Sequence, residues 1–169
     1  MKRFAAIRVV LALAGLGMAA FLARGDIHRR DAIARVGRAL SPFEVATLNG
    51  ETQRVPARNG TIVYTVFTTW CEECRAEVAH LRHADPLLRA RGVRLIAVDQ
   101  GEPAPAVAAF VAREHIGYPV LLDASGRSAT VLAASMVPTT VIVRDGIVLR
   151  ILRGAVSASE LERWSGPAR

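Results

Sequence analysis

Cysteine is scarce in this sequence: its 169 residues contain only two, Cys71 and Cys74, separated by two glutamates. A structural zinc site needs four ligands, usually a second pair of Cys or His beside the first. The nearest histidines, His80 and His83, fall on the same predicted helix as the cysteines, and at about 100° per residue they point to other sides of it. One helix cannot bring all four side chains to a single metal, which argues against a structural zinc site.

Aromatic residues are also few, at 5% of the sequence, and there is no internal repeat or low-complexity segment. A core with so few aromatic side chains has to be filled by Ala, Val and Leu. Because hydrophobic residues make up 51% of the chain, they suffice for one globular domain together with an additional apolar segment.

Acidic residues are outnumbered, and the formal net charge is +7. The basic excess lies in residues 1–40, which carry eight basic and two acidic side chains, whereas residues 41–169 carry fourteen basic and thirteen acidic ones. The high isoelectric point therefore reflects the N-terminal segment and does not indicate binding to nucleic acid.

The N-terminal segment has the pattern of an export signal. Met1-Lys2-Arg3 precedes an apolar stretch over residues 4–23 that only Arg8 interrupts. The fifteen uncharged residues from Val9 to Ala23 match the apolar region of a signal peptide, and the whole stretch is long enough to span a bilayer.

A cleavage site is poorly defined, because the best small-residue pattern is Gly17-Met18-Ala19. Of a signal anchor and a cleaved signal peptide over residues 1–23, we therefore favour the uncleaved anchor. Residues 24–40 would form a juxtamembrane linker, and residues 41–169 the folded domain.

The cysteine pair stands where a predicted strand meets a predicted helix. The apolar run Thr61–Thr68 predicts a strand buried on both faces, and a helical pattern begins directly after Cys71. Cysteines at positions i and i+3 of a first helical turn can form a disulfide with little backbone movement. The helix N-terminus favours a thiolate on Cys71, which would attack a partner, and Cys74 would resolve the mixed disulfide. A dithiol beside a β-α-β pattern thus predicts redox chemistry.

The two glutamates between the cysteines, Glu72 and Glu73, act against the helix N-terminus. Two carboxylates beside Cys71 make its thiolate less stable than neutral neighbours would. We therefore expect a pair toward the reducing end of the range of dithiol potentials.

Local patterns predict the other elements. Asn49-Gly50 and Asp145-Gly146 are hairpin turn signals, Ser157 and Glu160 form a capping box, and Pro86 is expected to kink or divide its helix. The predicted strands are residues 43–47, 52–55, 61–68, 93–98, 118–123, 139–143 and 147–152, and the predicted helices are residues 72–91, 106–115 and one that begins at 157.

Two crossover units followed by a hairpin and a helix predict an α/β thioredoxin fold, with a central mixed β-sheet flanked by helices on both faces.

With these elements placed, the sequence resembles the membrane-tethered TlpA/ResA/CcmG-like branch of the thioredoxin superfamily over about residues 40–165. The combination of motifs carries the resemblance: Ser41-Pro42-Phe43, Thr69-Trp70-Cys71-Glu72-Glu73-Cys74-Arg75-Ala76-Glu77, Tyr118–Asp123, Val137-Pro138-Thr139-Thr140 and Asp145-Gly146. It implies a thioredoxin fold with an N-terminal β-hairpin and an N-terminal membrane anchor.

The resemblance also implies roles for single residues. Val137–Pro138 would be a cis peptide that faces the dithiol and presents backbone to a substrate chain, the alternative being a trans proline at a strand start. Glu77 matches a glutamate near the dithiol that could exchange protons with Cys74, the alternative being a surface glutamate. Trp70 would either flank the active-site surface or pack into the core.

Three positions depart from the family. Glu73 and Ala79 stand where the family usually or often has proline, and Thr65 stands where cytoplasmic thioredoxins carry a buried Asp. The proton acceptor of those thioredoxins is therefore missing. These departures leave the predicted fold unchanged and bear on reduction potential, partner choice and rate.

On this resemblance we expect a thiol-disulfide oxidoreductase of the bacterial inner membrane, anchored in the lipid bilayer through residues 4–23, with its catalytic domain in the periplasm or another extracytoplasmic space. It would reduce disulfides in client proteins, in cytochrome c maturation or similar metalloprotein assembly, with electrons from a membrane dithiol reductant. The Cys71–Cys74 disulfide would be the redox centre, so no cofactor and no bound metal are expected.

Two other functions use the same cysteines. A Cu(I) metallochaperone would bind copper through Cys71 and Cys74, since soft thiolates suit that ion, but no well-placed histidine accompanies them. A peroxidase-like redoxin would need a cysteine in a different local context.

Overall fold

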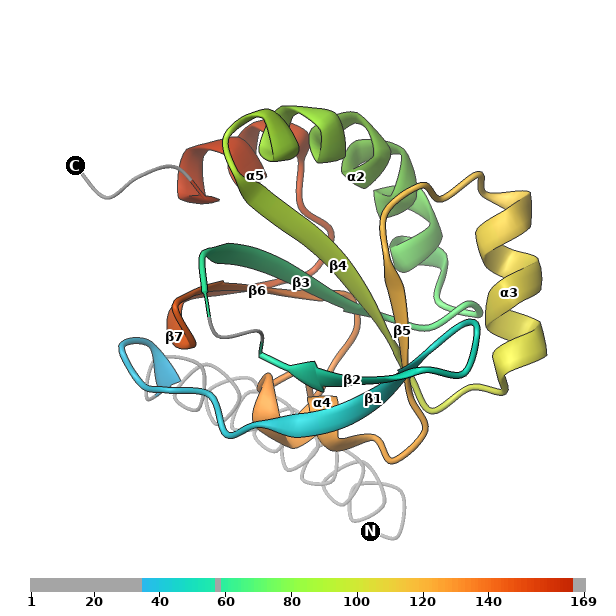
Figure 1. The fold of residues 1–169 in the computed structure, drawn as a ribbon. Helices are drawn as coiled ribbons and strands as arrows, with labels where there is room; N and C mark the ends of the chain where they lie inside the picture. The colour runs from blue at the N-terminus through green and yellow to red at the C-terminus, as the bar shows by residue number, and fades with distance from the viewer. Residues whose placement is uncertain (1–34, 57–58, 166–169) are drawn as a thin grey trace, which may run out of the picture. The chain divides into compact units, whose positions relative to one another are not determined.

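The computed structural model describes residues 35–56 and 59–165. These residues form a seven-stranded sheet in the order β2-β1-β5-β4-β3-β6-β7, with helices packed against it (Figure 1). The strands are β1 (Phe43–Thr47), β2 (Thr52–Val55), β3 (Thr61–Phe67), β4 (Val93–Gln100), β5 (Val120–Asp123), β6 (Thr139–Arg144) and β7 (Ile147–Arg153). The helices are α2 (Glu72–Ala90), α3 (Ala104–Arg113), α4 (Arg127–Val131) and α5 (Ala158–Ser165).

Strand β3 lies between β4, to which it is parallel, and β6, to which it is antiparallel. All its residues from Ile62 to Phe67 are buried, as expected for a continuous apolar strand covered on both faces. Phe67 lies opposite Asp99 of β4, and Val66 lies opposite Thr139 of β6. The end of β3, the end of β4 and the start of β6 therefore meet at one edge of the sheet.

Helices cover both faces of the sheet. The core on one face contains side chains from α2, α3 and α5, including Val78, Phe110 and Leu161. The core on the other face contains Val131 of α4 together with Phe43 of β1. The predicted mixed sheet with flanking helices and an N-terminal β-hairpin is confirmed, and β1 of that hairpin also pairs antiparallel with β5.

Two predicted helices differ from those observed. α2 is a single helix that contains Pro86, so of the two effects expected at this proline, a kink or a division, the division is wrong. Its apolar face is buried on both sides of the proline, at Leu81 and Leu88, and this packing keeps the helix continuous. α3 begins at Ala104, earlier than expected, because a first helical turn tolerates prolines such as Pro105.

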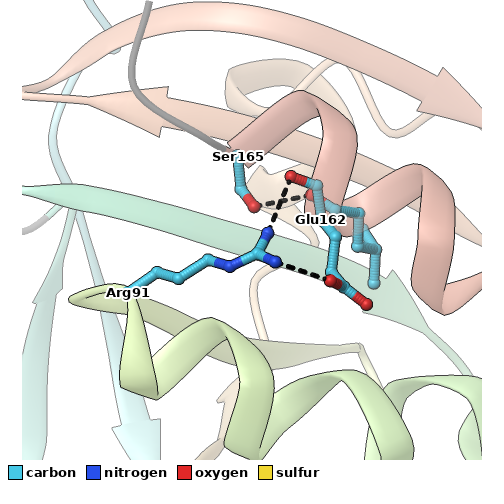
Figure 2. A network of polar contacts seen from close by, with 4 residues as sticks. Arg91, Glu162 and Ser165 are labelled. Atoms are coloured by element: carbon cyan, nitrogen blue, oxygen red, sulfur yellow. Dashed lines mark hydrogen bonds and ion pairs between the residues drawn. The ribbon is translucent and has the colours of Figure 1, made fainter.

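The ends of α2 and α5 are joined by a small polar network (Figure 2). Arg91, which follows α2, donates to the Glu162 carboxylate at 2.8 Å and to the Glu162 carbonyl oxygen at 3.4 Å. The Ser165 hydroxyl donates to the Leu161 carbonyl oxygen at 2.6 Å. α5 begins with the predicted capping box, in which the Ser157 amide donates to Glu160 at 2.9 Å. The bonds from Arg91 to Glu162 hold α5 against α2, whereas the other two lie within α5 and its cap.

The first described residues lie along the β6–β7 hairpin. The Gly37 amide donates to the Val148 carbonyl oxygen at 2.8 Å, and the Leu40 amide donates to the Gly146 carbonyl oxygen at 2.9 Å. The described fold thus starts before Ser41, where the sequence analysis places the start of the domain. The anchor predicted over residues 4–23 lies outside the described residues. Among residues 35–56 and 59–165, no helix is long and apolar enough to cross a membrane.

Candidate active site

The two cysteines form a disulfide at the start of α2. Their Cα atoms are 5.2 Å apart, and Cys71 is the N-cap of the helix, with its sulfur accepting a hydrogen bond from the Cys74 amide at 3.1 Å. Cys74 is buried, with 2% of its surface exposed, whereas Cys71 is partly exposed. The predicted arrangement, in which Cys71 stands at the helix N-terminus and Cys74 lies one turn further in, is present.

The loop before β6 lies against Cys71. The Cys71 sulfur is 4.0 Å from the Val137 carbonyl oxygen, and the Val137–Pro138 peptide is cis. Pro138 is buried, and its carbonyl oxygen accepts a hydrogen bond from the Gly154 amide at 3.0 Å. The sheet therefore brings Val137 and Pro138 to the dithiol, although they are more than sixty residues away in sequence.

Trp70 lies at the surface next to Cys71, with 71% of the residue's surface exposed. Of the two placements weighed from the sequence, packing in the core is wrong. Met136, beside Val137 in the facing loop, is also exposed, at 46%. Two large apolar side chains next to the Cys71–Val137 contact are therefore open to solvent.

Glu77, by contrast, is buried, with only 1% of its surface exposed. It lies one helical turn beyond Cys74, where its Oε1 atom accepts a hydrogen bond from the Val156 amide at 2.9 Å and its Oε2 atom accepts one from the Thr65 hydroxyl at 3.3 Å. Burial raises the pKa of Glu77 to about 7, because these two hydrogen bonds only partly offset the lost hydration. At neutral pH this carboxyl group can therefore both take up and release a proton.

Cys74 and Glu77 line the same small cavity, of about 10 Å³. Its other walls are mostly apolar and come from β3, β4, α2 and the segment around α3, including Phe110 and Tyr118. This volume is close to the minimum that holds one water molecule. Burial, and then the nearby Glu77, raises the pKa of Tyr118 above its ordinary value, so this phenol stays protonated. The cavity places one titratable carboxyl group beside the inner cysteine.

A model of the AhpC/TSA family matches residues 36–151. The chain belongs to the AhpC/TSA family.

Individual relatives are thiol-disulfide oxidoreductases. The chain is 28% identical over 130 residues to the thiol-disulfide oxidoreductase ResA of Geobacillus kaustophilus, covering 76% of this chain and 75% of that protein. The fold is similar to that of StoA from Bacillus subtilis, with a TM-score of 0.65 and 20% identity over 73% of this chain and 96% of that one. It is also similar to a secreted Mycobacterium tuberculosis disulfide oxidoreductase homologous to E. coli DsbE, with a TM-score of 0.64 and 23% identity over 73% of this chain and 93% of that one.

These comparisons confirm the predicted relation to ResA-like redoxins and the thioredoxin fold. This AhpC/TSA-family chain is a thiol-disulfide oxidoreductase of the ResA-like redoxin type with a Cys71–Cys74 pair. Within the described residues, no three Cys, His, Asp or Glu side chains form a group that could hold a metal ion.

The loop between β7 and α5 contributes partners that could not be predicted from the sequence. The Ala155 amide donates to the Glu73 carboxylate at 3.1 Å, and the next amide, that of Val156, donates to Glu77. Two glutamates of α2, one turn apart, thus hold two successive amides of this loop, while Gly154 bonds to Pro138. Backbone amides carry no signal in the sequence, so these partners could not be found from the residue types.

Thr65 shows how this chain arranges its buried acid. On the resemblance described above, Thr65 stands where cytoplasmic thioredoxins carry a buried Asp. Thr65 is buried on β3, and its hydroxyl donates to Glu77 of α2. The ionisable group beside the inner cysteine is therefore on the helix rather than on the strand.

Proposed function

We propose that this protein is a reductase of client disulfides, in which Cys71 is the nucleophile and Cys74 the resolving cysteine. The observation that carries this assignment is the unequal placement of the two sulfurs. Cys71 caps a helix N-terminus, where a thiolate is favoured and a client can reach it, whereas Cys74 is buried beside Glu77.

The proposed reaction has two exchange steps. The Cys71 thiolate attacks one sulfur of a client disulfide, a Cys71–client disulfide forms, and the other client sulfur leaves as a thiolate that is protonated by water. Cys74 then gives up its proton and attacks the Cys71 sulfur. The Cys71–Cys74 disulfide forms, the second client sulfur leaves as a thiolate and is protonated, and two electrons have passed from the protein to the client.

Glu77 is proposed to take the proton from Cys74 in the second step. Its pKa of about 7 makes it a suitable base near neutral pH, and it lines the cavity that Cys74 also lines, so the proton can move directly or through one water molecule. The same carboxyl group can return the proton when the disulfide is reduced again.

Trp70, Val137 and Pro138 are proposed to bind the client. The Val137 carbonyl oxygen is beside the Cys71 sulfur and can accept a hydrogen bond from the client backbone, while the exposed Trp70 offers apolar surface directly before Cys71 in the sequence. Such contacts bring a client disulfide to the nucleophile without requiring one particular client sequence.

We further propose that residues 1–23 anchor the protein in the bacterial inner membrane, followed by a juxtamembrane linker from residue 24, with the thioredoxin-like domain in the periplasm or another extracytoplasmic space. A membrane dithiol reductant would supply the electrons, and the clients would be cytochromes c under maturation or similar metalloproteins. The apolar stretch over residues 4–23 and the similarity to ResA support this setting.

A trapping experiment tests the proposed roles of the cysteines. In the Cys74→Ala variant the mixed disulfide on Cys71 cannot be resolved, so client proteins should accumulate covalently bound and be released by dithiothreitol. The matched control, Cys71→Ala, keeps only the buried cysteine and should trap none. Equal trapping by the two variants, or none by either, would refute the assignment.

A further inference from the structure

The segment that leads from β3 to Cys71 is held by a glutamate from another loop. Thr69 lies two residues before Cys71. Its amide donates to the Oε2 atom of Glu102 at 2.5 Å, and its hydroxyl donates to the Oε1 atom of the same side chain at 2.6 Å. Both carboxylate oxygens of Glu102 thus hold one residue. Hydrogen bonds to an ionised carboxylate are shorter and stronger than those between neutral groups.

Glu102 is itself held by the sheet. It lies in the loop between β4 and α3, and its amide donates to the Oδ2 atom of Asp99 at 2.9 Å. Asp99 of β4 is 1% exposed and lies opposite Phe67 of the neighbouring strand β3. Phe67 precedes Thr69 by two residues. The ends of β3 and β4 are therefore bridged in a chain of contacts from Asp99 through Glu102 to Thr69.

Asp99, which accepts the bond from the Glu102 amide, is a buried carboxyl group. Burial raises the pKa of Asp99 to about 7, with the nearby carboxyl groups of Glu102 and Asp123 adding to the rise and the hydrogen bond from the Glu102 amide opposing it. The Oδ1 atom of Asp99 has no hydrogen-bond partner among the described residues. A proton on Asp99 relieves the repulsion between these neighbouring carboxyl groups.

We infer that Glu102 is a positioning residue for the dithiol: by fixing Thr69 it sets the place at which Trp70 and Cys71 meet a client disulfide. Thr69 is directly bonded to Trp70, and Cys71 follows. Without the two contacts to Glu102, the turn between β3 and α2 would keep its own backbone bond, from the Cys71 amide to the Thr68 carbonyl oxygen at 3.3 Å. This inference rests on the proposed function, because it concerns the reach of Cys71 toward a client.

The test compares Glu102→Gln with Glu114→Gln in the full chain. Glu114 follows α3 and accepts a hydrogen bond from Arg113 at the surface, so its variant removes the same charge away from the dithiol. The rate constant for reduction of insulin by the reduced protein is measured well below the unfolding transition. Glu102→Gln should lower this rate constant about tenfold, the factor that corresponds to the free energy of one charge-assisted hydrogen bond. Glu114→Gln should have the rate constant of wild type. A wild-type rate in folded Glu102→Gln protein would overturn the inference.

The direction of the effect separates positioning from the other roles that Glu102 could have. Removing a negative charge near Cys71 makes its thiolate more stable, so a purely electrostatic role predicts more thiolate at a given pH, seen as a shift in the pH profile of Cys71 alkylation by iodoacetamide. A merely structural role lowers the melting temperature and leaves the rate of the folded protein unchanged. Positioning predicts a slower reaction with insulin even when the variant and wild type are compared at equal fractions of Cys71 thiolate, taken from the alkylation profile.

A second pair of variants keeps the inference testable if Glu102→Gln does not fold. Thr69→Val removes the hydroxyl and keeps the amide, so it should lose part of the insulin rate, and Thr69→Ser should restore it. Equal rates in the two variants would contradict the inference.

Hydrogen exchange of the Thr69 amide gives a readout that does not depend on activity. This amide should exchange at least about tenfold faster in Glu102→Gln than in wild type, because its acceptor is weakened. Equal exchange would show that Glu102 does not hold the turn. If wild type fails to reduce insulin, the proposed function fails instead, and the exchange rates still decide whether Glu102 holds Thr69.

Discussion

Replacing Glu77 with glutamine should change how the stability of the oxidised protein depends on pH. Burial raises the pKa of Glu77 from its ordinary value of 4.5 to about 7 in the folded protein. Between these two values the folded protein keeps a proton that the unfolded chain has released. The free energy of unfolding therefore falls as the pH rises from about 4.5, and the loss levels off above about 7.

The size of this effect follows from the difference in pKa. At about 1.4 kcal/mol for each pH unit, the whole effect amounts to roughly 3.5 kcal/mol, of which about 2.5 kcal/mol falls between about pH 5 and about pH 8. A glutamine side chain has no titrating proton, so Glu77→Gln should lack this part of the pH dependence. Asp99, whose pKa is also raised to about 7, titrates in both proteins and cancels in the comparison.

Urea denaturation of the oxidised proteins at about pH 5 and about pH 8 measures the difference. From about pH 5 to about pH 8, the free energy of unfolding of wild type should fall by about 2.5 kcal/mol more than that of Glu77→Gln. The surface control Glu114→Gln should follow wild type. Any change in hydrogen bonding caused by the amide is present at both pH values and cancels. If Glu77→Gln loses as much stability as wild type, Glu77 titrates near its ordinary pKa, and its proposed role as a base at neutral pH fails.

Two other substitutions test the surroundings of the dithiol. Gly154→Ala should destabilise the fold by about 1 kcal/mol or more, because Gly154 has a φ of 81° and an added Cβ would lie 3.2 Å from the Glu73 Oε1 atom. Urea denaturation measures this loss against the control Gly117→Ala, where an added Cβ meets open space. Equal free energies of unfolding in the two variants would contradict the prediction. Trp70→Ala should leave the unfolding free energy within about 0.5 kcal/mol but lower kcat/KM for insulin severalfold. An unchanged kcat/KM would remove Trp70 from the client-binding surface.

Local features of the fold could be predicted from the sequence because neighbouring residues determine them. Asn49-Gly50 forms the turn of the first hairpin, where Gly50 has a φ of 86°. The capping box of Ser157 and Glu160 is present, and Cys71 caps α2 at the end of an apolar strand. In each case residues no more than a few positions apart decide the structure.

Contacts between distant segments could not be predicted in the same way. Glu77 and Val156 are separated by 79 positions, and the partner of the carboxylate is a backbone amide that any residue type except proline supplies. Thr69 and Glu102 are separated by 33 positions, and nothing in the loop before α3 distinguishes Glu102 from an ordinary surface glutamate. The sheet brings these groups together, so the fold was needed to find them.

The central claim, a reducing dithiol, is tested most directly by the reduction potential of the Cys71–Cys74 pair at neutral pH. Glu72 and Glu73 occupy the first turn of α2, beside Cys71, where their charges oppose the thiolate. We predict a potential below about −220 mV, toward the thioredoxin end of the scale. A value near about −120 mV would mark an oxidant and contradict the account, and the absence of any titrating disulfide would exclude thiol-disulfide exchange by this pair.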